Sequence, residues 1–178
     1  MLAVRGRSEP EAAKRFLRPR MDQRSDPALL ADGPAAAERI ARAVRDGERI
    51  FIHGDYDVDG ICATAILTRW LRSLGGTVTP FVPHRVRDRY DFAKGGLNAA
   101  KADGVSLIVT VDCGTMAHET VTAANQAGLD VIVTDHHTVG ATLPNALAVV
   151  NPQRADCSYP DKGLCGAGVA FRVFHGAV

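Results

Sequence analysis

Cysteine, net charge and long hydrophobic runs are all scarce in this sequence of 178 residues. The four cysteines form no Cys-x-x-Cys pair, so a disulfide scaffold is not expected and a reducing compartment is predicted. No hydrophobic run approaches the roughly 18 residues that a membrane span needs, and the N-terminus lacks the hydrophobic stretch of a signal peptide. We therefore expect a cytoplasmic protein with no membrane contact. The net charge of +1 neither requires nor excludes nucleic acid as a partner.

The charges that are present are unevenly distributed. Residues 1–35 are rich in arginine, proline and alanine, and we expect them to form a basic lead-in segment before a domain that spans residues 36–178. A second basic patch, "HRVRDR" at residues 84–89, contains His84 and Arg85. Each patch is open to two interpretations, a solvated surface or a contact with phosphate groups.

Hydrophobic runs and helical patterns alternate along the rest of the chain. Strands are predicted at "RIFIHG", "TVTPFVP", "VSLIVTVDCG", "DVIVTDHH" and "ALAVVNP", with Pro80 placing the second of them at a sheet edge. Helical patterns lie between the strands, and "GAGVAFRVF" begins a last helix. The alternation predicts an α/β fold with a mostly parallel β-sheet and helices on both faces.

Three of the predicted strands run directly into acidic or histidine side chains. The strand at "RIFIHG" runs into His53, Asp55, Asp57 and Asp59. The strand at "VSLIVTVDCG" runs into Asp112, and the strand at "DVIVTDHH" runs into Asp135, His136 and His137. Because ligands bind beyond the carboxyl ends of parallel strands, we expect these side chains to meet in one crevice.

Carboxylates packed this closely would raise one another's pKa values unless cations offset the repulsion. Carboxylate and imidazole ligands suit Mn²⁺, Fe²⁺ or Zn²⁺, and a carboxylate-rich set without thiolates favours Mn²⁺ or Mg²⁺. The donors exceed the needs of one ion, so two ions are predicted, with Asp112 shared between them. Each motif alone has a simpler interpretation: Asp59 as a helix N-cap, or "VDCG" and "DHH" as ordinary turns. Three acid-bearing strand ends together favour the metal site.

The motifs "HGDYDVDGICAT", "TVDCGT", "VIVTDHH" and "LCGAGVAF", in this order, resemble those of the DHH phosphoesterase superfamily. The form they take is similar to the bacterial RecJ single-strand-specific exonucleases, and "VVNPQRADCSYPDKGLCGAG" strengthens that likeness. The resemblance implies Mn²⁺- or Mg²⁺-dependent hydrolysis of single-stranded DNA, 5′ to 3′, in DNA repair and recombination. It also implies single-strand-binding protein as a partner.

The resemblance implies a role for each motif residue. Asp57, Asp59, Asp112 and His136 are expected as metal ligands, and His53 and Asp55 as additional ones. His137 would contact the scissile phosphate, with Asp135 orienting a histidine. Gly166 and Gly168 would let a helix start approach a phosphate, and His84 and Arg85 are further candidates for substrate contact.

Members of this family are longer than the present chain, so we expect a catalytic domain truncated at its C-terminus, with a further aspartate ligand and a second domain absent. The activity of such a fragment is left open. Two alternatives also stay open. One is another DHH-family phosphodiesterase acting on short oligonucleotides or cyclic dinucleotides, and the other is a non-catalytic fragment that binds nucleic acid through residues 5–24.

Overall fold

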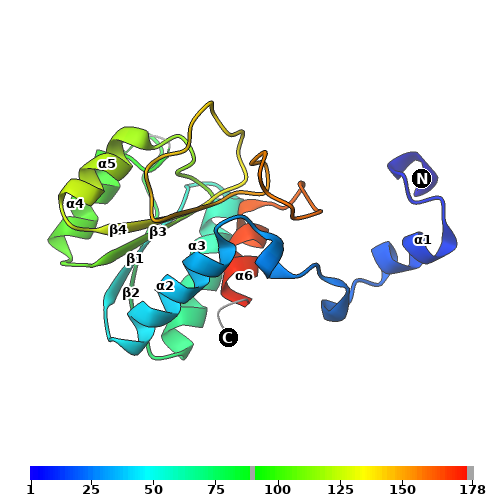
Figure 1. Ribbon diagram of the computed structural model, residues 1–178, viewed down its shortest axis with the longest axis horizontal. Coiled ribbons are helices and arrows are strands. Elements are labelled where there is room, and N and C mark those ends of the chain that lie inside the picture. Colours follow the sequence, from blue (N-terminus) through cyan, green and yellow to red (C-terminus); the bar gives the residue numbers. More distant parts are fainter. Residues whose placement is uncertain (89–90, 176–178) are drawn as a thin grey trace.

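The computed structural model describes residues 1–88 and 91–175 and contains one parallel β-sheet (Figure 1). The five strands lie in the order β2-β1-β3-β4-β5, and every neighbouring pair is parallel. Their bounds are Arg49–His53 (β1), Thr77–Phe81 (β2), Leu107–Val111 (β3), Asp130–Thr134 (β4) and Ala148–Val150 (β5). The predicted parallel α/β fold is thus confirmed, and Pro80 lies in edge strand β2 as expected.

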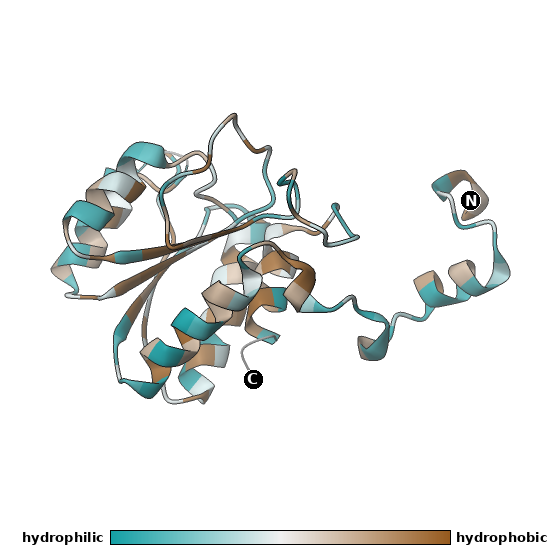
Figure 2. Ribbon diagram, in the orientation of Figure 1, coloured by the Kyte–Doolittle hydropathy of each residue, from teal (hydrophilic) through white to brown (hydrophobic). Residues whose placement is uncertain are grey.

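Helices cover both faces of the sheet because its strands are apolar on both sides. On one face α2, α3 and α6 pack against strand residues such as Ile52, Val109 and Ile132; on the other, α4 and α5 pack against Phe51, Ile108 and their neighbours. Figure 2 shows the hydrophobic colours on the strands between these two layers. The helix bounds are Gly33–Arg45 (α2), Val58–Ser73 (α3), Lys94–Ala102 (α4), His118–Gln126 (α5) and Gly166–His175 (α6).

A buried arginine links the amino ends of two strands, β1 and β4. Arg39 of α2 is only 6% exposed. Its guanidinium donates two hydrogen bonds to Glu48, at 3.1 and 2.8 Å, and one to Asp130 at 2.6 Å. These carboxylates lie where β1 and β4 begin, so one cation links a helix to two strands of the sheet.

The N-terminal segment runs away from this body (Figure 1). It contains the short 3-10 helices Ala3–Arg5 (η1), Met21–Gln23 (η2) and Pro27–Leu29 (η3), and the α-helix Pro10–Leu17 (α1). Residues 1–29 bury no side chain, whereas Leu30 is 1% exposed and packs in the core. A domain boundary near residue 35 stays a proposal, and the packing of Leu30 places the last residues of the lead-in against the domain.

Within residues 1–88 and 91–175, no helix has both the length and the hydropathy that a bilayer crossing requires.

Candidate metal centre

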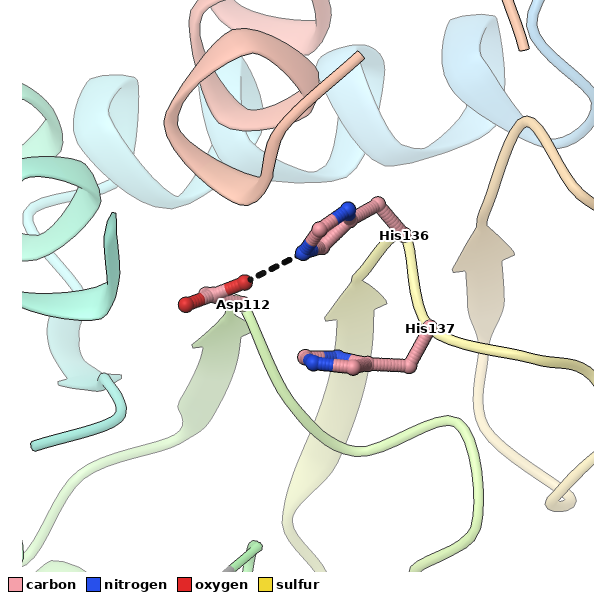
Figure 3. A group of neighbouring side chains, drawn as sticks. All are labelled: Asp112, His136 and His137. Carbon is pink, nitrogen blue, oxygen red and sulfur yellow. Dashed lines mark ion pairs between the residues drawn. The ribbon is translucent and has the colours of Figure 1, made fainter. Parts of the chain in front are cut away.

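The carboxyl ends of β1, β3 and β4 lie side by side, and the acidic motifs follow them directly. Two groups of potential ligands form there: Asp112 with His136 and His137, and Asp112 with Asp55 and Asp57. In each group the ligand atoms lie within 4.8 Å of one another. Figure 3 shows both histidine rings reaching from the loop after β4 toward Asp112 at the end of β3. Asp112 belongs to both groups, which is the position that a shared ligand requires.

Asp112 combines burial of a carboxylate with a strained backbone conformation. It is 1% exposed and has a positive φ of 64°, a conformation that costs a non-glycine residue energy. Its Oδ1 accepts no hydrogen bond from the residues described, although His136 Nε2 lies 3.1 Å away. Burial, then the charges of Asp59 and Asp57, raise the pKa of Asp112 to about 8. A buried carboxylate without a hydrogen-bond donor among acidic neighbours fits a divalent cation.

Asp55 completes the acidic side of the site. It is 3% exposed, and its Oδ1 accepts a hydrogen bond of 2.7 Å from the backbone of Tyr56. Burial and the nearby charge of Asp57 raise the pKa of Asp55. Two of the acids at this edge therefore ionise less readily than an exposed aspartate.

Asp57 and Asp59 accept hydrogen bonds at the starts of two different helices. The structure corrects the alternative in which Asp59 begins α3: the N-cap is Asp57, whose Oδ1 accepts from the backbone N–H groups of Asp59 and Gly60 at 2.9 and 3.0 Å. Asp59 instead reaches the start of α6, where it accepts from Gly166 and Ala167 at 2.6 and 2.8 Å. Its Oδ2 is also 3.6 Å from His136 Nε2, so Asp59 joins the site through that ring.

Asp135 holds His137 in place. The carboxylate Oδ1 is 2.7 Å from His137 Nδ1 and also accepts from the His136 and His137 backbones. Burial opposes ionisation of Asp135, but the hydrogen bonds from Thr115 and His137 lower its pKa below the usual value. Burial lowers the pKa of His137, but the Asp135 contact and the charges of Asp112 and Asp55 together raise it above its usual value. The pair is therefore stabilised as a carboxylate and an imidazolium.

Asp91 is a residue of the site that the sequence analysis missed. It precedes α4, has a φ of 73°, and its Oδ1 accepts from the backbone of Gly114 at 2.7 Å. Gly114 itself has a φ of 108°, so Asp91 fixes the bend that follows Asp112. Burial raises the pKa of Asp91. Asp91 belongs to no periodic pattern of the sequence. Its one distinguishing signal is an acidic side chain close to the basic stretch before α4.

The structure places His53 outside both ligand groups. Its ring packs between Phe81 and Phe92, with centroids 5.2 Å away in each case, and its Nδ1 lies 3.6 Å from Cys113 Sγ. A Cβ at Gly96 would lie 2.4 Å from its Nε2, so α4 covers the ring. Burial lowers the pKa of His53 to about 4 and keeps it neutral. This packing argues against the expectation that His53 is a metal ligand.

The two glycines of the fourth motif differ. A Cβ at Gly166 would lie 2.2 Å from Asp112 Oδ1, so only glycine lets α6 start this close to the site. A Cβ at Gly168 would make ordinary contacts with Leu164 and Cys165 at 3.4 Å or more. The backbone N–H of Gly166, expected to face a phosphate, is bonded to Asp59 instead.

The two mid-chain basic candidates, His84 and Arg85, differ in their surroundings. The Arg85 guanidinium is 5.2 Å from the ring centroid of Tyr56, which separates Asp55 from Asp57. His84 is exposed, and its Nδ1 lies 3.3 Å from the backbone nitrogens of Val86 and Arg87. Arg85 is thus the one of the two that adjoins the acidic loop, and contact of either with substrate remains a prediction.

The chain matches the model of the DHH family, N-terminal domain, over residues 49–177. It is 38% identical over 175 residues to a single-stranded-DNA-specific exonuclease RecJ of Bacillus subtilis and 42% identical over 172 residues to one of Dickeya dadantii. These alignments cover 98% and 96% of this chain but only 22% and 29% of the relatives. The chain therefore spans less than a third of their length.

Solved structures show the same fold. A crystal structure of an exonuclease RecJ bound to manganese superimposes with a TM-score of 0.74 at 40% identity, covering 83% of this chain and 37% of the other. RecJ from Thermus thermophilus in complex with Mn²⁺ gives a TM-score of 0.67 at 36% identity, over 93% of this chain and 24% of that one. The resemblance seen in the motifs is confirmed by sequence and by fold.

Proposed function

The chain belongs to the DHH family, and on that premise we propose that it forms the catalytic core of a metal-dependent nuclease that hydrolyses single-stranded DNA from the 5′ end. The observation that carries this proposal is Asp112, which is buried, accepts no hydrogen bond on Oδ1 from any described residue, and belongs to both ligand groups. The relatives that match nearly the whole of this chain are RecJ exonucleases. Because the chain spans less than a third of them, the activity of the whole protein belongs to the proposal.

Mn²⁺ or Mg²⁺ is the proposed cofactor, with two ions at the shared aspartate. Asp55, Asp57 and Asp112 would hold one ion, and Asp112 and His136 the other, with Asp59 beside His136. Such a pair supplies a hydroxide near neutral pH and offsets the charge of a phosphoryl displacement. Manganese and magnesium are both found in RecJ structures whose fold this chain shares.

His137 and Asp135 have the second role in the proposal. Asp135 fixes the ring through Nδ1 and favours its protonated form. A fixed imidazolium next to Asp112 would place positive charge beside the scissile phosphate, where negative charge develops. Arg85, on the Tyr56 ring, and His84 would contact the phosphates that follow.

The wider setting is proposed from the relatives. Their substrate, single-stranded DNA, supports a role in DNA repair and recombination, with single-strand-binding protein as a partner and the cytoplasm as the location.

The test is release of mononucleotides from a 5′-labelled single strand by this chain with Mn²⁺. Asp57→Asn keeps an N-cap for α3 but loses the ligand charge, and His136→Ala removes an imidazole. Asp46→Asn, at an exposed position after α2, is the matched control. We expect activity in the unsubstituted chain and in the control and its loss in both site variants.

Two results would contradict the proposal: no metal-dependent release by the unsubstituted chain, or equal release by all four proteins. A short oligonucleotide and a cyclic dinucleotide are assayed beside the long strand. Faster turnover of either would move the assignment to another branch of the family.

A further inference from the structure

We propose that a basic groove between the N-terminal segment and α6 binds the phosphate backbone of single-stranded DNA, apart from the metal centre. The identity of the strand rests on the proposed function, while the groove itself is drawn from its own side chains. We call it the N-terminal groove and define it by Arg7, Arg15, Phe16, Arg20, Arg24, Tyr159 and Arg172.

The N-terminal groove is a hollow of about 530 Å³. Residues between Arg7 and Ser25 form one wall, and the other wall is formed by Tyr159, Asp161 and Arg172. The two walls are more than 130 residues apart in the sequence. The lead-in segment therefore builds a concave surface with the domain even though residues 1–29 bury no side chain.

The charge of the groove is almost entirely positive. Five arginines face a single carboxylate, Asp161, whose Oδ1 already accepts from the backbone of Gly163 at 3.1 Å. Of the five, Arg20 is paired with Asp22 at 2.8 Å. The other four form no ion pair with any carboxylate in the described parts of the chain. Several guanidinium groups without counter-charges in one hollow favour a polyanion.

Arg24 is hydrogen-bonded only in part. Its Nε donates to the carbonyl of Met21 at 2.6 Å, and its Nη2 lies 3.0 Å from His175 Nε2. Its Nη1 is buried and has no hydrogen-bond partner among the residues described. A buried donor left without a partner is costly, so the guanidinium of Arg24 places an incompletely satisfied positive charge in the wall of the groove.

Aromatic rings accompany the arginines. Arg7 lies 5.9 Å from the ring centroid of Phe16, and Arg24 lies 5.4 Å from that of Phe171. Phe16 is 50% exposed, so one large ring of the groove wall remains accessible. Grooves that bind single strands combine positive charge along the backbone with exposed rings on which bases stack. Phe16 is placed to act as such a ring.

Helix α6 connects the groove to the metal centre. The helix begins at Gly166, against Asp112, and carries Arg172 six residues later. A rise of about 1.5 Å per residue puts Arg172 about 9 Å farther along the helix axis. A strand with one phosphate at the metal centre would therefore have to travel only a short way to enter the groove.

The experiment measures binding of a labelled oligothymidylate by fluorescence anisotropy in EDTA, where no turnover occurs. The groove variant Arg7→Ala/Arg15→Ala/Arg172→Ala is compared with Arg42→Ala/Arg45→Ala/Arg69→Ala, a control that removes three exposed arginines of α2 and α3 outside the groove. We expect the groove variant to bind at least about tenfold more weakly, with the slope of log affinity against log salt smaller by about 2. The control should keep the slope of the unsubstituted chain.

Phe16→Ala should weaken binding about fivefold or more without changing the salt slope, because it removes stacking and no charge. Equal losses in the groove and control variants, or unchanged binding by the groove variant, would overturn the proposal. If the groove substitutions weaken strand binding but the chain fails the nuclease assay, only the proposed function is overturned. If the chain is an active nuclease but the groove substitutions leave strand binding unchanged, only this inference is overturned.

Discussion

The two ends of the β-sheet differ in how their buried charges are compensated. At the amino end, Arg39 is 6% exposed and bonded to two carboxylates. At the carboxyl end, Asp112 is 1% exposed, surrounded by other acids, and holds an oxygen without a hydrogen bond from any described residue. The first arrangement stabilises the fold by itself. The second makes physical sense only with a cation from solution, and this difference distinguishes a structural ion network from a binding site.

The amino end should show the largest effect on stability. Arg39→Ala leaves Glu48 and Asp130 without their shared partner, and we expect the free energy of unfolding to fall by about 2–3 kcal/mol. The loss is smaller than for a fully buried ion pair because both carboxylates keep some contact with water. Urea unfolding measures this. Arg42→Ala, an exposed change on the same helix, should stay within about 0.5 kcal/mol. Equal effects would mean that the Arg39 network does not stabilise the fold.

At the carboxyl end, Gly166→Ala should chiefly affect the metal. Its Cβ would fall 2.2 Å from Asp112 Oδ1, so Asp112 or the start of α6 must move. We expect Mn²⁺ affinity to fall about 10- to 100-fold, the range seen when support around a metal ligand is lost. Isothermal titration calorimetry measures it. Gly168→Ala is the control, since its Cβ meets only ordinary contacts, and unchanged affinity in both variants would show that this close approach is unimportant.

Asp91 allows a finer comparison at the same end. Asp91→Gly tolerates the positive φ but loses the acceptor for the Gly114 N–H, whereas Asp91→Asn keeps an acceptor and also tolerates this φ. We expect about tenfold weaker Mn²⁺ binding for Asp91→Gly and little change for Asp91→Asn. If the two variants lose affinity alike, the charge of Asp91 matters rather than its hydrogen bond to the loop.

The last comparison is the pH dependence of stability without metal. The pKa of Asp112 is raised to about 8 in the folded chain, against 3.8 when unfolded. Between these values the folded state retains a proton that the unfolded state releases. The contribution of Asp112 to the free energy of unfolding is therefore greatest below pH 4 and is lost as the pH rises through 8. Urea unfolding in EDTA at several pH values should show a decline that Asp112→Asn reduces; identical profiles would contradict the raised pKa.

Much of the fold was predictable because its signals are local. Apolar runs bounded by turns marked the five strands, and their alternation with helical patterns indicated a parallel sheet. Parallel strands end at one edge, so the meeting of Asp112 with Asp57 and His136 followed from strand order without any side-chain information.

Side-chain partners were less predictable because they join distant parts of the chain. Asp59 caps a helix that starts 107 residues later, and Asp91 bonds to Gly114 across a loop with no periodic pattern. The direction of the His53 ring was in principle readable. Alternation along β1 puts His53 on the face of Phe51, which α4 and α5 cover, and opposite to Ile52.

The most direct test of the account is unfolding of the chain and of Asp112→Asn at pH 8, each with EDTA and with Mn²⁺. The account predicts that in EDTA the variant is at least as stable as the unsubstituted chain, because a repelled, buried charge has been removed. Mn²⁺ at about 100 times its dissociation constant should stabilise the unsubstituted chain by about 2.7 kcal/mol and the variant far less. Equal stabilisation of both proteins by Mn²⁺, or none of either, would contradict a metal centre built on Asp112.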